Sequence, residues 1–296
     1  MILVVGGTGL VGGTVCSLLA RDGIAARALV RATSDPAKVE HLHALGLETV
    51  EGDLRDPASL RAACEGVDAL ICTVSSMPFT YEPGVNDIET TDRAGVLHLV
   101  DAAVAAGVGH FVYTSFSANL DLEFPLGQAK RAVEQHLMAS GMGYTILRPS
   151  CFMEVWLSPA VGFDPGAGTV TLYGTGAEPV SYIAVQDVAR FAVASLTAPG
   201  ARNAVLELGG PRPVSQAEAA EIFGRAAGRP VATTNVPVDA LLAQADGTTD
   251  GMQRSFAMLM ACVAKGDPID MGSLPEGLPS DLTSVEEYAA RQFIAA

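Results

Sequence analysis

Five glycines between residues 6 and 13 have the spacing expected of a phosphate-binding loop. They follow the apolar run ILVV at 2–5, where a first strand would turn into a helix. Glycine allows a tight turn and close approach of a pyrophosphate, and the amides at the helix start attract the anion. The alternative is an ordinary strand–helix turn with packing glycines, but this position favours a dinucleotide site. The residues predicted to form it, in the overlapping patterns GxxGxxG and GxGxxG, are Gly6, Thr8, Gly9, Leu10, Val11 and Gly12.

The second candidate is the arginine at the end of the next apolar run, LVR. NAD sites normally place Asp or Glu there to bind the ribose hydroxyl, whereas arginine accommodates the extra phosphate of NADP. Arg31 occupies this position, no carboxylate replaces it, and Ser34 and Lys38 follow closely. A guanidinium can bind phosphate through two parallel hydrogen bonds. The sequence therefore favours NADP, with Arg31 and Ser34 at the cofactor, and a solvated surface arginine is the alternative.

A third motif, EGDLRD at 51–56, follows the next predicted strand. Asp53 can accept a hydrogen bond from the adenine amino group with Leu54 beside the ring, so we assign both to the cofactor. Asp56 precedes Pro57, which is the pattern of a helix N-cap with proline at the first helical position. We expect Asp56 to be structural.

The composition argues against several classes of function. Eighteen basic and 33 acidic residues give a net charge of −15, which disfavours nucleic acid and anionic membranes as partners. Apolar runs such as 256–264 are too short to span a bilayer, and a strand starting at residue 2 leaves no room for a signal peptide. The five cysteines and five histidines are scattered. We therefore expect reduced thiols, no metal site and a cytoplasmic location.

The elements that must position these motifs alternate through the first half. Repeated strand–helix units with continuously apolar strands indicate a parallel sheet covered on both faces. Right-handed crossovers then give an α/β fold with a doubly wound parallel sheet (Rossmann), whose ligand lies at the carboxyl ends of the strands. Strands are predicted at 2–5, 26–31, 47–52, 68–74, 110–115 and 144–149, and helices at 10–21, 36–45, 57–64, 86–106 and 127–140.

The regular alternation ends after Pro149. Residues 162–179 are rich in turn formers, 181–196 look like one more strand–helix pair, and short Gly/Pro-punctuated helices follow Gly209. We predict a dinucleotide-binding domain at 1–150, to which 180–209 returns. Residues 151–179 and 210–296 then form a second, smaller substrate-binding lobe.

Several segments together resemble a known family. GGTGLVG, LVR, GDLRD, AAVAAGVGHFVYTS, AKRAVEQHLMASGMGYTILRPSCFME and YIAVQDVAR occur in that order. They are similar to the NmrA-like group of atypical short-chain dehydrogenase/reductases, which includes quinone reductases and isoflavone-reductase-type enzymes. The resemblance covers nearly the whole chain and is specific to the group, but it says little about the substrate.

We expect an NADP(H) cofactor and an apolar small-molecule substrate, in a monomer or homodimer. The resemblance implies that the nicotinamide lies at the carboxyl ends of the fourth, fifth and sixth strands. The cofactor-binding positions that match there are Thr73, Val74, Ser75, Thr114, Pro149, Ser150 and Phe152, and Lys130 is added from the following helix.

Lys130 matches the lysine of the family and is the first catalytic candidate. The usual short-chain pattern has a tyrosine four residues earlier, but Leu126 stands there, so the tyrosinate acid–base group is absent. An ammonium beside the nicotinamide would orient the cofactor and stabilise charge that develops on a reduced acceptor. Glu134 lies at i+4, however, so an exposed helical ion pair is the alternative. Ser115, at the end of a strand, is the second catalytic candidate.

Two functions remain open. The first is an NADPH-dependent oxidoreductase that transfers hydride to an apolar, aromatic or conjugated acceptor such as a quinone or enone. The second is a catalytically silent, NADP(H)-sensing regulatory protein, as some members of the group are. The retained lysine favours the enzyme, and Leu126 keeps the sensor open. Side chains with weaker signals are Tyr81, Cys151, Asp187, Met252, Phe256, Met258 and Met260.

Overall fold

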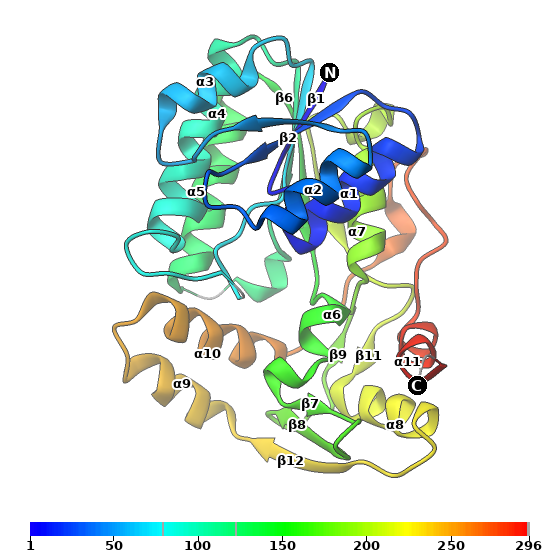
Figure 1. Ribbon diagram of the computed structural model, residues 1–296. Coiled ribbons are helices and arrows are strands. Elements are labelled where there is room, and N and C mark those ends of the chain that lie inside the picture. Colours follow the sequence, from blue (N-terminus) through cyan, green and yellow to red (C-terminus); the bar gives the residue numbers. More distant parts are fainter. Residues whose placement is uncertain (79, 122, 295–296) are drawn as a thin grey trace.

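The computed structural model describes residues 1–78, 80–121 and 123–294. Its centre is a seven-stranded sheet of order β10–β6–β5–β4–β1–β2–β3 in which every neighbouring pair is parallel (Figure 1). This confirms the predicted doubly wound α/β fold. The strands are β1 (Ile2–Val5), β2 (Ala26–Val30), β3 (Glu48–Glu51), β4 (Ala69–Cys72), β5 (His110–Thr114), β6 (Gly143–Pro149) and β10 (Ala204–Leu208).

The strand order reverses beside β1, and this determines where a ligand can lie. β1 pairs with β2 on one side and with β4 on the other, so the loops that follow β1 and β4 diverge to opposite faces. A crevice at the carboxyl ends of the strands forms at such a switch point. The glycine loop follows β1, and residues 73–75 follow β4, so both motifs border this crevice.

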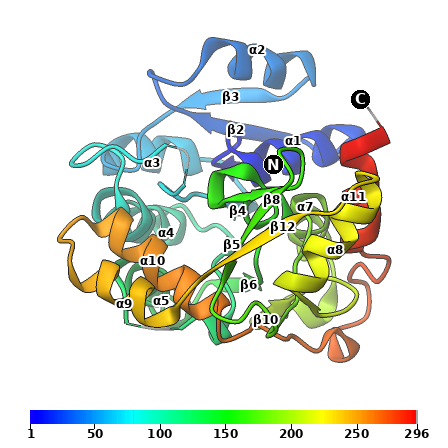
Figure 2. The ribbon, with the colours of Figure 1, turned by 90° about the horizontal axis from the view of Figure 1, so that it is seen from below.

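Helices cover both faces of the sheet (Figures 1 and 2). The apolar sides of α1 and α7 are buried in one cluster, and those of α3, α4 and α5 in another on the opposite face. The predicted helix at 86–106 is divided, because its first two turns form a π-helix and only the rest is α-helical. The elements are α1 (Leu10–Arg21), α2 (Pro36–Ala44), α3 (Pro57–Cys64), π-helix η1 (Ile88–Gly95), α4 (Val96–Ala105), α5 (Pro125–Ala139) and α7 (Val185–Ala194), with 3₁₀ turns η2 (Ala118–Leu120) and η4 (Pro199–Ala201).

The remaining elements gather below the carboxyl edge of the sheet (Figure 1). A small sheet of order β12–β8–β7 pairs β12 parallel and β7 antiparallel to β8. The strand predicted near 181 is shorter than expected, since β9 ends at Val180 and Ile183 only bridges to Phe152. The elements are α6 (Met153–Trp156), η3 (Pro159–Val161), β7 (Phe163–Asp164), β8 (Thr169–Tyr173), β9 (Pro179–Val180), β11 (Val214–Ser215), α8 (Gln216–Ala226), β12 (Ala232–Val236), α9 (Val238–Asp246), α10 (Gly251–Val263) and α11 (Val285–Ile294). The 3₁₀ turn η5 (Met271–Ser273) lies instead against the cluster formed by α1 and α7.

The C-terminal segment connects the two parts of the molecule. Leu274 and Leu282 pack against the cluster formed by α1 and α7, although the sequence assigns them to the smaller lobe. Asp187 holds this segment, because its carboxylate accepts a hydrogen bond from the Thr283 amide at 2.8 Å and pairs with Arg190 at 3.1 Å. The division into two lobes stays a prediction, and these contacts join its parts.

Within the described residues, no helix is long and apolar enough to cross a membrane. All five cysteines are buried, and the described chain contains no disulfide. Burial raises the pKa of Cys16 to about 12 and that of Cys64 to about 11. These thiols are therefore protonated at neutral pH and pack as small apolar side chains.

Candidate active site

The glycine loop has a shape that side chains would prevent. Gly6 has φ of +94°, and a Cβ on it would lie 2.8 Å from Thr73 Oγ1. A Cβ on Gly12 would lie 2.1 Å from the Gly6 carbonyl oxygen, so α1 can start this close to the loop only with glycine there. Gly12 therefore supports the loop from beneath.

The start of α1 is left open for a ligand. Its N-cap is Gly9, which provides no side-chain hydrogen bond, whereas α2 and α3 are capped by Asp35 and Asp56. The first amides of a helix have no partner within the helix and attract anions. Hence the amides after Gly9 are the ones available for a phosphate. The predicted structural role of Asp56 is confirmed, because it accepts from the Ala58 amide at 2.9 Å.

A groove with a volume of about 1060 Å³ runs along this loop. It passes from the end of β2, over the start of α1, to the end of β4. Gly12 lies beneath the groove and is absent from its lining. The predicted cofactor residues that line it are Gly6, Thr8, Gly9, Leu10, Val11, Arg31, Ser34, Asp53, Leu54, Thr73, Val74, Ser75 and Phe152.

Basic side chains gather at the β2 end of the groove. Arg31 is exposed, and among the described residues its guanidinium forms no ion pair. Lys38 reaches back from α2 and donates a hydrogen bond to the Thr8 carbonyl oxygen at 3.2 Å. Asp53 lies opposite them with its carboxylate bound by Arg55, and these hydrogen bonds lower the pKa of Asp53. Its predicted contact with adenine stays a prediction.

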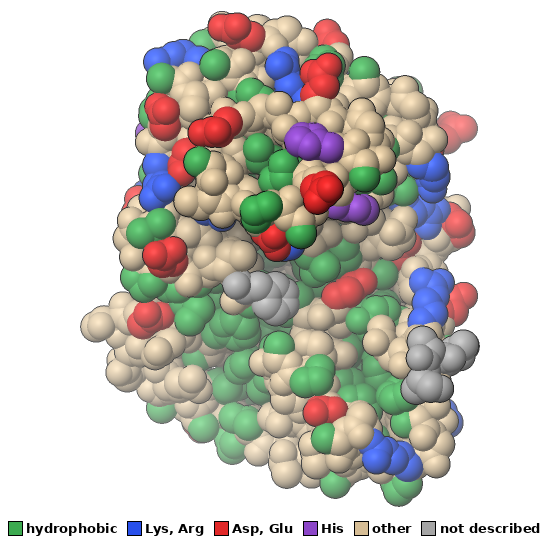
Figure 3. Space-filling view, in the orientation of Figure 1, with side chains coloured by type: hydrophobic (Ala, Val, Ile, Leu, Met, Phe, Trp, Pro, Cys, Tyr) green, Lys and Arg blue, Asp and Glu red, His purple; other side chains and the backbone are tan. Residues whose placement is uncertain are grey.

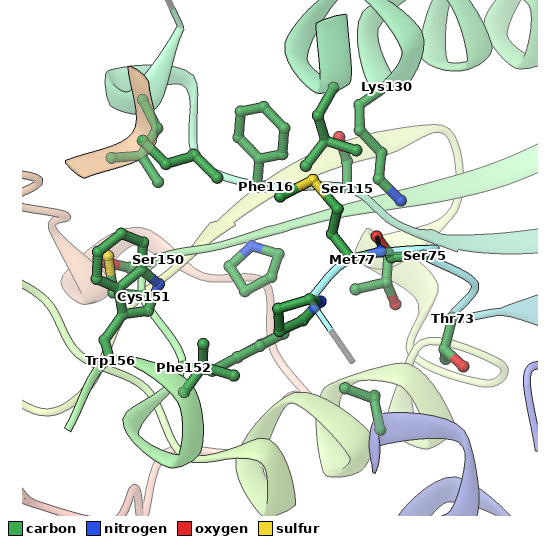
Figure 4. A pocket seen from close by; sticks show the side chains of 18 of the residues that line it. Thr73, Ser75, Met77, Ser115, Phe116, Lys130, Ser150, Cys151, Phe152 and Trp156 are labelled. Atoms are coloured by element: carbon green, nitrogen blue, oxygen red, sulfur yellow. Dashed lines mark hydrogen bonds between the residues drawn. The ribbon is translucent and has the colours of Figure 1, made fainter. Parts of the chain in front are cut away.

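At the β4 end, the groove continues into an apolar cavity of about 160 Å³. Side chains from the segment after β4, from β5 and β6, and from α5, α6 and α10 converge on it (Figure 4). Thr73, Val74, Ser75 and Phe152 line both spaces, so a ligand in the groove can reach the cavity. In the space-filling view, the surface is hollowed at this junction, and hydrophobic side chains gather around it (Figure 3). The remaining predicted residues that line the cavity are Thr114, Ser115, Lys130, Pro149 and Ser150.

Lys130 is the cation at this cavity. It extends from α5 toward the segment after β4, and its side chain is only 4% exposed (Figure 4). Nζ donates a hydrogen bond to the Val74 carbonyl oxygen at 2.9 Å and lies 3.4 Å from Oδ1 of Asp92. Its ammonium also lies 5.3 Å from the centre of the Tyr113 ring.

The alternative interpretation of Lys130, an exposed pair with Glu134, is wrong. Glu134 is 1% exposed and pairs with Arg131 and Arg148, each at 2.5 Å. Burial alone would raise the pKa of Glu134, but hydrogen bonds from Arg148 and Ser115 and the two positive charges lower it below its usual value. The i+4 spacing was misleading because both side chains point into the protein and have tertiary partners.

The two hydroxyl groups at the end of β5 differ in their partners. Ser115 Oγ accepts from Arg131 Nη1 at 3.3 Å and is close enough to Glu134 to influence its carboxylate. Thr114 Oγ1 is buried and, within the described part of the chain, has no hydrogen-bond partner. Buried hydroxyl groups are normally paired, so the unpaired Thr114 Oγ1, in the lining of the cavity, is a candidate to contact a ligand.

Apolar side chains close the cavity. Leu126 lines it at the position of the missing tyrosine. Phe256 also lines it, as part of the apolar wall considered from the sequence, but the methionines of α10 do not. Cys151 lies at the wall, and burial raises its pKa well above the usual value. Tyr81 packs above α10 without lining the cavity.

The sequence did not identify several contributors. Trp156, Leu259 and Met77 line the cavity, and Asp92 lies behind Lys130. Trp156 follows the sixth strand within a few residues, which was a usable signal. Asp92 and Leu259 meet the site only through tertiary packing, and nothing in their spacing indicated it. No cluster of three or more potential metal ligands occurs among the described residues.

Three comparisons relate this geometry to known proteins. Residues 1–289 match the sequence model of the NmrA-like family. The NAD(P)H azoreductase of Xenophilus azovorans is 37% identical over 261 residues, which cover 88% of this chain and 85% of that protein. The photosystem II assembly factor Ycf39 of Trieres chinensis is 31% identical over 80% of this chain and 72% of its own. The crystal structure of an NADPH-dependent quinone oxidoreductase from Escherichia coli, complexed with NADPH, superposes with a TM-score of 0.79 at 25% identity, covering 99% of this chain and 100% of that one.

Proposed function

The chain belongs to the NmrA-like family, and on this premise we propose that it is an NADPH-dependent reductase of apolar aromatic or conjugated acceptors. The observation that carries the proposal is the buried ammonium of Lys130 at the point where the groove joins the apolar cavity. A protein that only sensed the cofactor would need no cation at a second, apolar ligand space.

The groove suits a dinucleotide phosphate. The open amides after Gly9 would bind a pyrophosphate, and the left-handed Gly6 would permit its close approach. Arg31, with Ser34 and Lys38 beside it, would bind the additional phosphate of NADP. Leu54 and Asp53, which also line the groove, are the residues we assign to adenine. The relatives named as NAD(P)H azoreductase and NADPH-dependent quinone oxidoreductase support this assignment.

The chain's own residues complete the reaction. Reduced NADP, when bound, supplies a hydride from its nicotinamide ring to the acceptor. The Lys130 ammonium stabilises the negative charge that develops on the acceptor heteroatom and donates the proton that completes the reduction. Ser115 stays a candidate for polarising the acceptor, and Thr114 competes with it because Oγ1 is unpaired.

The cavity restricts the acceptor. Its walls are mostly aromatic and aliphatic, and among the described residues that line it Lys130 alone carries a charge. A flat, uncharged ring system with one carbonyl, imine or azo group would bury its apolar part and present one heteroatom to Lys130. Quinones and enones fit this description, as do the azo compounds implied by the name of the Xenophilus relative. We propose a monomer or homodimer in the cytoplasm, where the five buried thiols stay reduced.

The test is NADPH consumption with a panel of quinones, conjugated ketones and azo dyes. We expect turnover of at least one class, and Lys130→Met should lower kcat by about 100-fold, the loss typical of one oxyanion-stabilising donor. Lys265→Met, on the exposed loop after α10, is the matched control and should leave kcat unchanged. If no acceptor is reduced while NADP⁺ and NADPH bind with very different affinities, regulatory sensing replaces catalysis.

A further inference from the structure

Lys130 has a buried aspartate neighbour that is part of neither the groove nor the cavity. Asp92 belongs to the π-helix η1, is 0% exposed and lines neither space. Its Oδ2 accepts hydrogen bonds from the Ser76 amide at 3.0 Å and the Ser76 hydroxyl at 2.6 Å. Its Oδ1 has no hydrogen-bond partner in the described chain and lies 3.4 Å from Lys130 Nζ. One oxygen is therefore anchored, and the other is directed at the lysine.

Asp92 is the negative charge that compensates the buried ammonium. In the part of the chain that the structure describes, the other titratable groups facing Lys130 are Cys72 on β4 and Tyr113 on β5. Burial raises the pKa of Cys72 to about 11 and that of Tyr113 well above its usual value, so both are neutral near pH 7. Glu134, on the same helix as Lys130, is committed to two arginines. A buried ammonium without a counter-ion loses its proton readily, whereas a nearby carboxylate favours the charged form.

The contacts also fix the direction of the ammonium. An ammonium has three N–H donors. The Val74 carbonyl oxygen accepts one of them, and the carboxylate of Asp92 attracts a second. The third is left for the cavity, which Lys130 lines. Asp92 lies on η1, outside both spaces, whereas Val74 lines them, so the donor that neither of them uses is the one left for a ligand.

We propose that Asp92 is the positioning residue of the site, which keeps the Lys130 ammonium charged and directs its free N–H into the cavity. Asp92 itself touches neither cofactor nor acceptor. The expected effect of Asp92 on turnover rests on the proposed reductase function. The expected effect of Asp92 on the charge of Lys130 does not depend on any acceptor.

The first test is Asp92→Asn, which keeps the size of the side chain and removes its charge. Lys38, Lys130 and Lys265 are the chain's three lysines, so acylation of each can be followed by peptide mass spectrometry. At neutral pH, we expect Lys130 of the variant to be acylated about ten-fold faster relative to Lys38 and Lys265, because the neutral amine is the reactive form. We also expect kcat to fall about ten-fold or more and NADPH affinity to stay within two-fold. The alkaline limb of the pH–rate profile, where turnover is lost as pH rises, should shift to lower pH in the variant.

Asp187→Asn is the matched control. Asp187 is also a buried helical aspartate with one oxygen on a backbone amide and the other on a cation, but it lies outside both spaces. The Asp187→Asn variant should change thermal stability without changing the acylation rate of Lys130 or the pH dependence of turnover. Unchanged Lys130 acylation in Asp92→Asn, or the same change in Asp187→Asn, overturns the proposal.

Two further outcomes are distinguishable. If the wild-type protein reduces no acceptor, the acylation experiment still decides the role of Asp92, while the reductase proposal alone fails. If Asp92→Asn does not fold, Ser76→Ala replaces it, since it removes the hydroxyl hydrogen bond to Oδ2 of Asp92 but keeps the amide hydrogen bond and the charge. That variant should lower kcat a few-fold at unchanged NADPH affinity, and an unchanged kcat then overturns the proposal.

Discussion

Replacement of Arg31 by alanine tests how the groove selects its cofactor. Arg31 is exposed at the end of β2, and in the described chain no carboxylate pairs with its guanidinium, which leaves it free to bind a phosphate. Hydrogen bonds to a charged group contribute about 1.5–3 kcal/mol, and the exposed position places this contact in the lower half of the range. Lys38 remains at the same end of the groove and retains part of the attraction.

The expected loss is about 2 kcal/mol, which corresponds to a roughly 30-fold higher Kd for NADPH. NADH lacks the additional phosphate, so its Kd should change by less than about two-fold. Fluorescence titration with both cofactors measures the two affinities directly. Because the contact is exposed, the effect should shrink as salt rises from low to physiological ionic strength.

Arg21→Ala is the control for the loss of an exposed arginine. Arg21 ends α1, pairs with Asp22 at 2.8 Å and lies outside the groove. It should leave both affinities unchanged. If Arg31→Ala still prefers NADPH to the wild-type degree, the assignment of Arg31 to the NADP phosphate is refuted, and Lys38 would have to carry the selectivity alone.

Two further predictions concern side chains around the cavity. Glu134→Gln should lower the free energy of unfolding by about 3 kcal/mol, because it leaves Arg131 and Arg148 without their shared buried carboxylate, and chemical denaturation measures this. The pKa of Glu134 is lower in the folded state than in the unfolded state. The contribution of Glu134 to folding stability is therefore fully present above its unfolded-state pKa and is lost as pH falls through its folded-state pKa. A stability difference between Glu134→Gln and wild type that persists unchanged in strong acid would contradict the argument. Thr114→Val should lower kcat with the best acceptor more than Ser115→Ala does, because Ser115 Oγ is held by Arg131 whereas Thr114 Oγ1 is unpaired. The reverse order in steady-state kinetics would return the polarising role to Ser115.

The parts of the site that the sequence predicted are those determined by local structure. The glycine loop, Arg31 and the residues after β4 each follow a strand directly, and the parallel sheet brings all strand ends to one edge. Their positions in the groove therefore followed from the order of strands and helices. The N-cap role of Asp56 was equally local and is confirmed.

The parts that the sequence could not predict depend on packing between distant segments. The surroundings of Lys130 were misjudged because i+4 spacing describes an exposed helix, whereas α5 is buried against η1 and the sheet. Leu259 comes from α10, in the segment predicted to form the smaller lobe, and Asp92 comes from η1 and lies beside Lys130. Neither carries a motif, and tertiary contact alone places them at the site.

The apolar surroundings of Lys130 raise the free-energy cost of burying its ammonium and also strengthen the interaction of this ammonium with a developing negative charge. With Leu126 in place of a tyrosine, Lys130 is the one charged group among the described residues that line the cavity, and the walls around it are mostly aromatic and aliphatic. Low polarity strengthens the attraction between an ammonium and a developing negative charge, but it also penalises the unpaired ammonium before any ligand arrives. A carboxylate within the cavity would compete with the acceptor for the Lys130 ammonium. Asp92 lies outside the cavity, so it offsets the cost of burying the ammonium without this competition. An atypical reductase that has lost the tyrosine therefore needs a counter-ion outside its substrate space, and the Asp92–Lys130 pair has this arrangement.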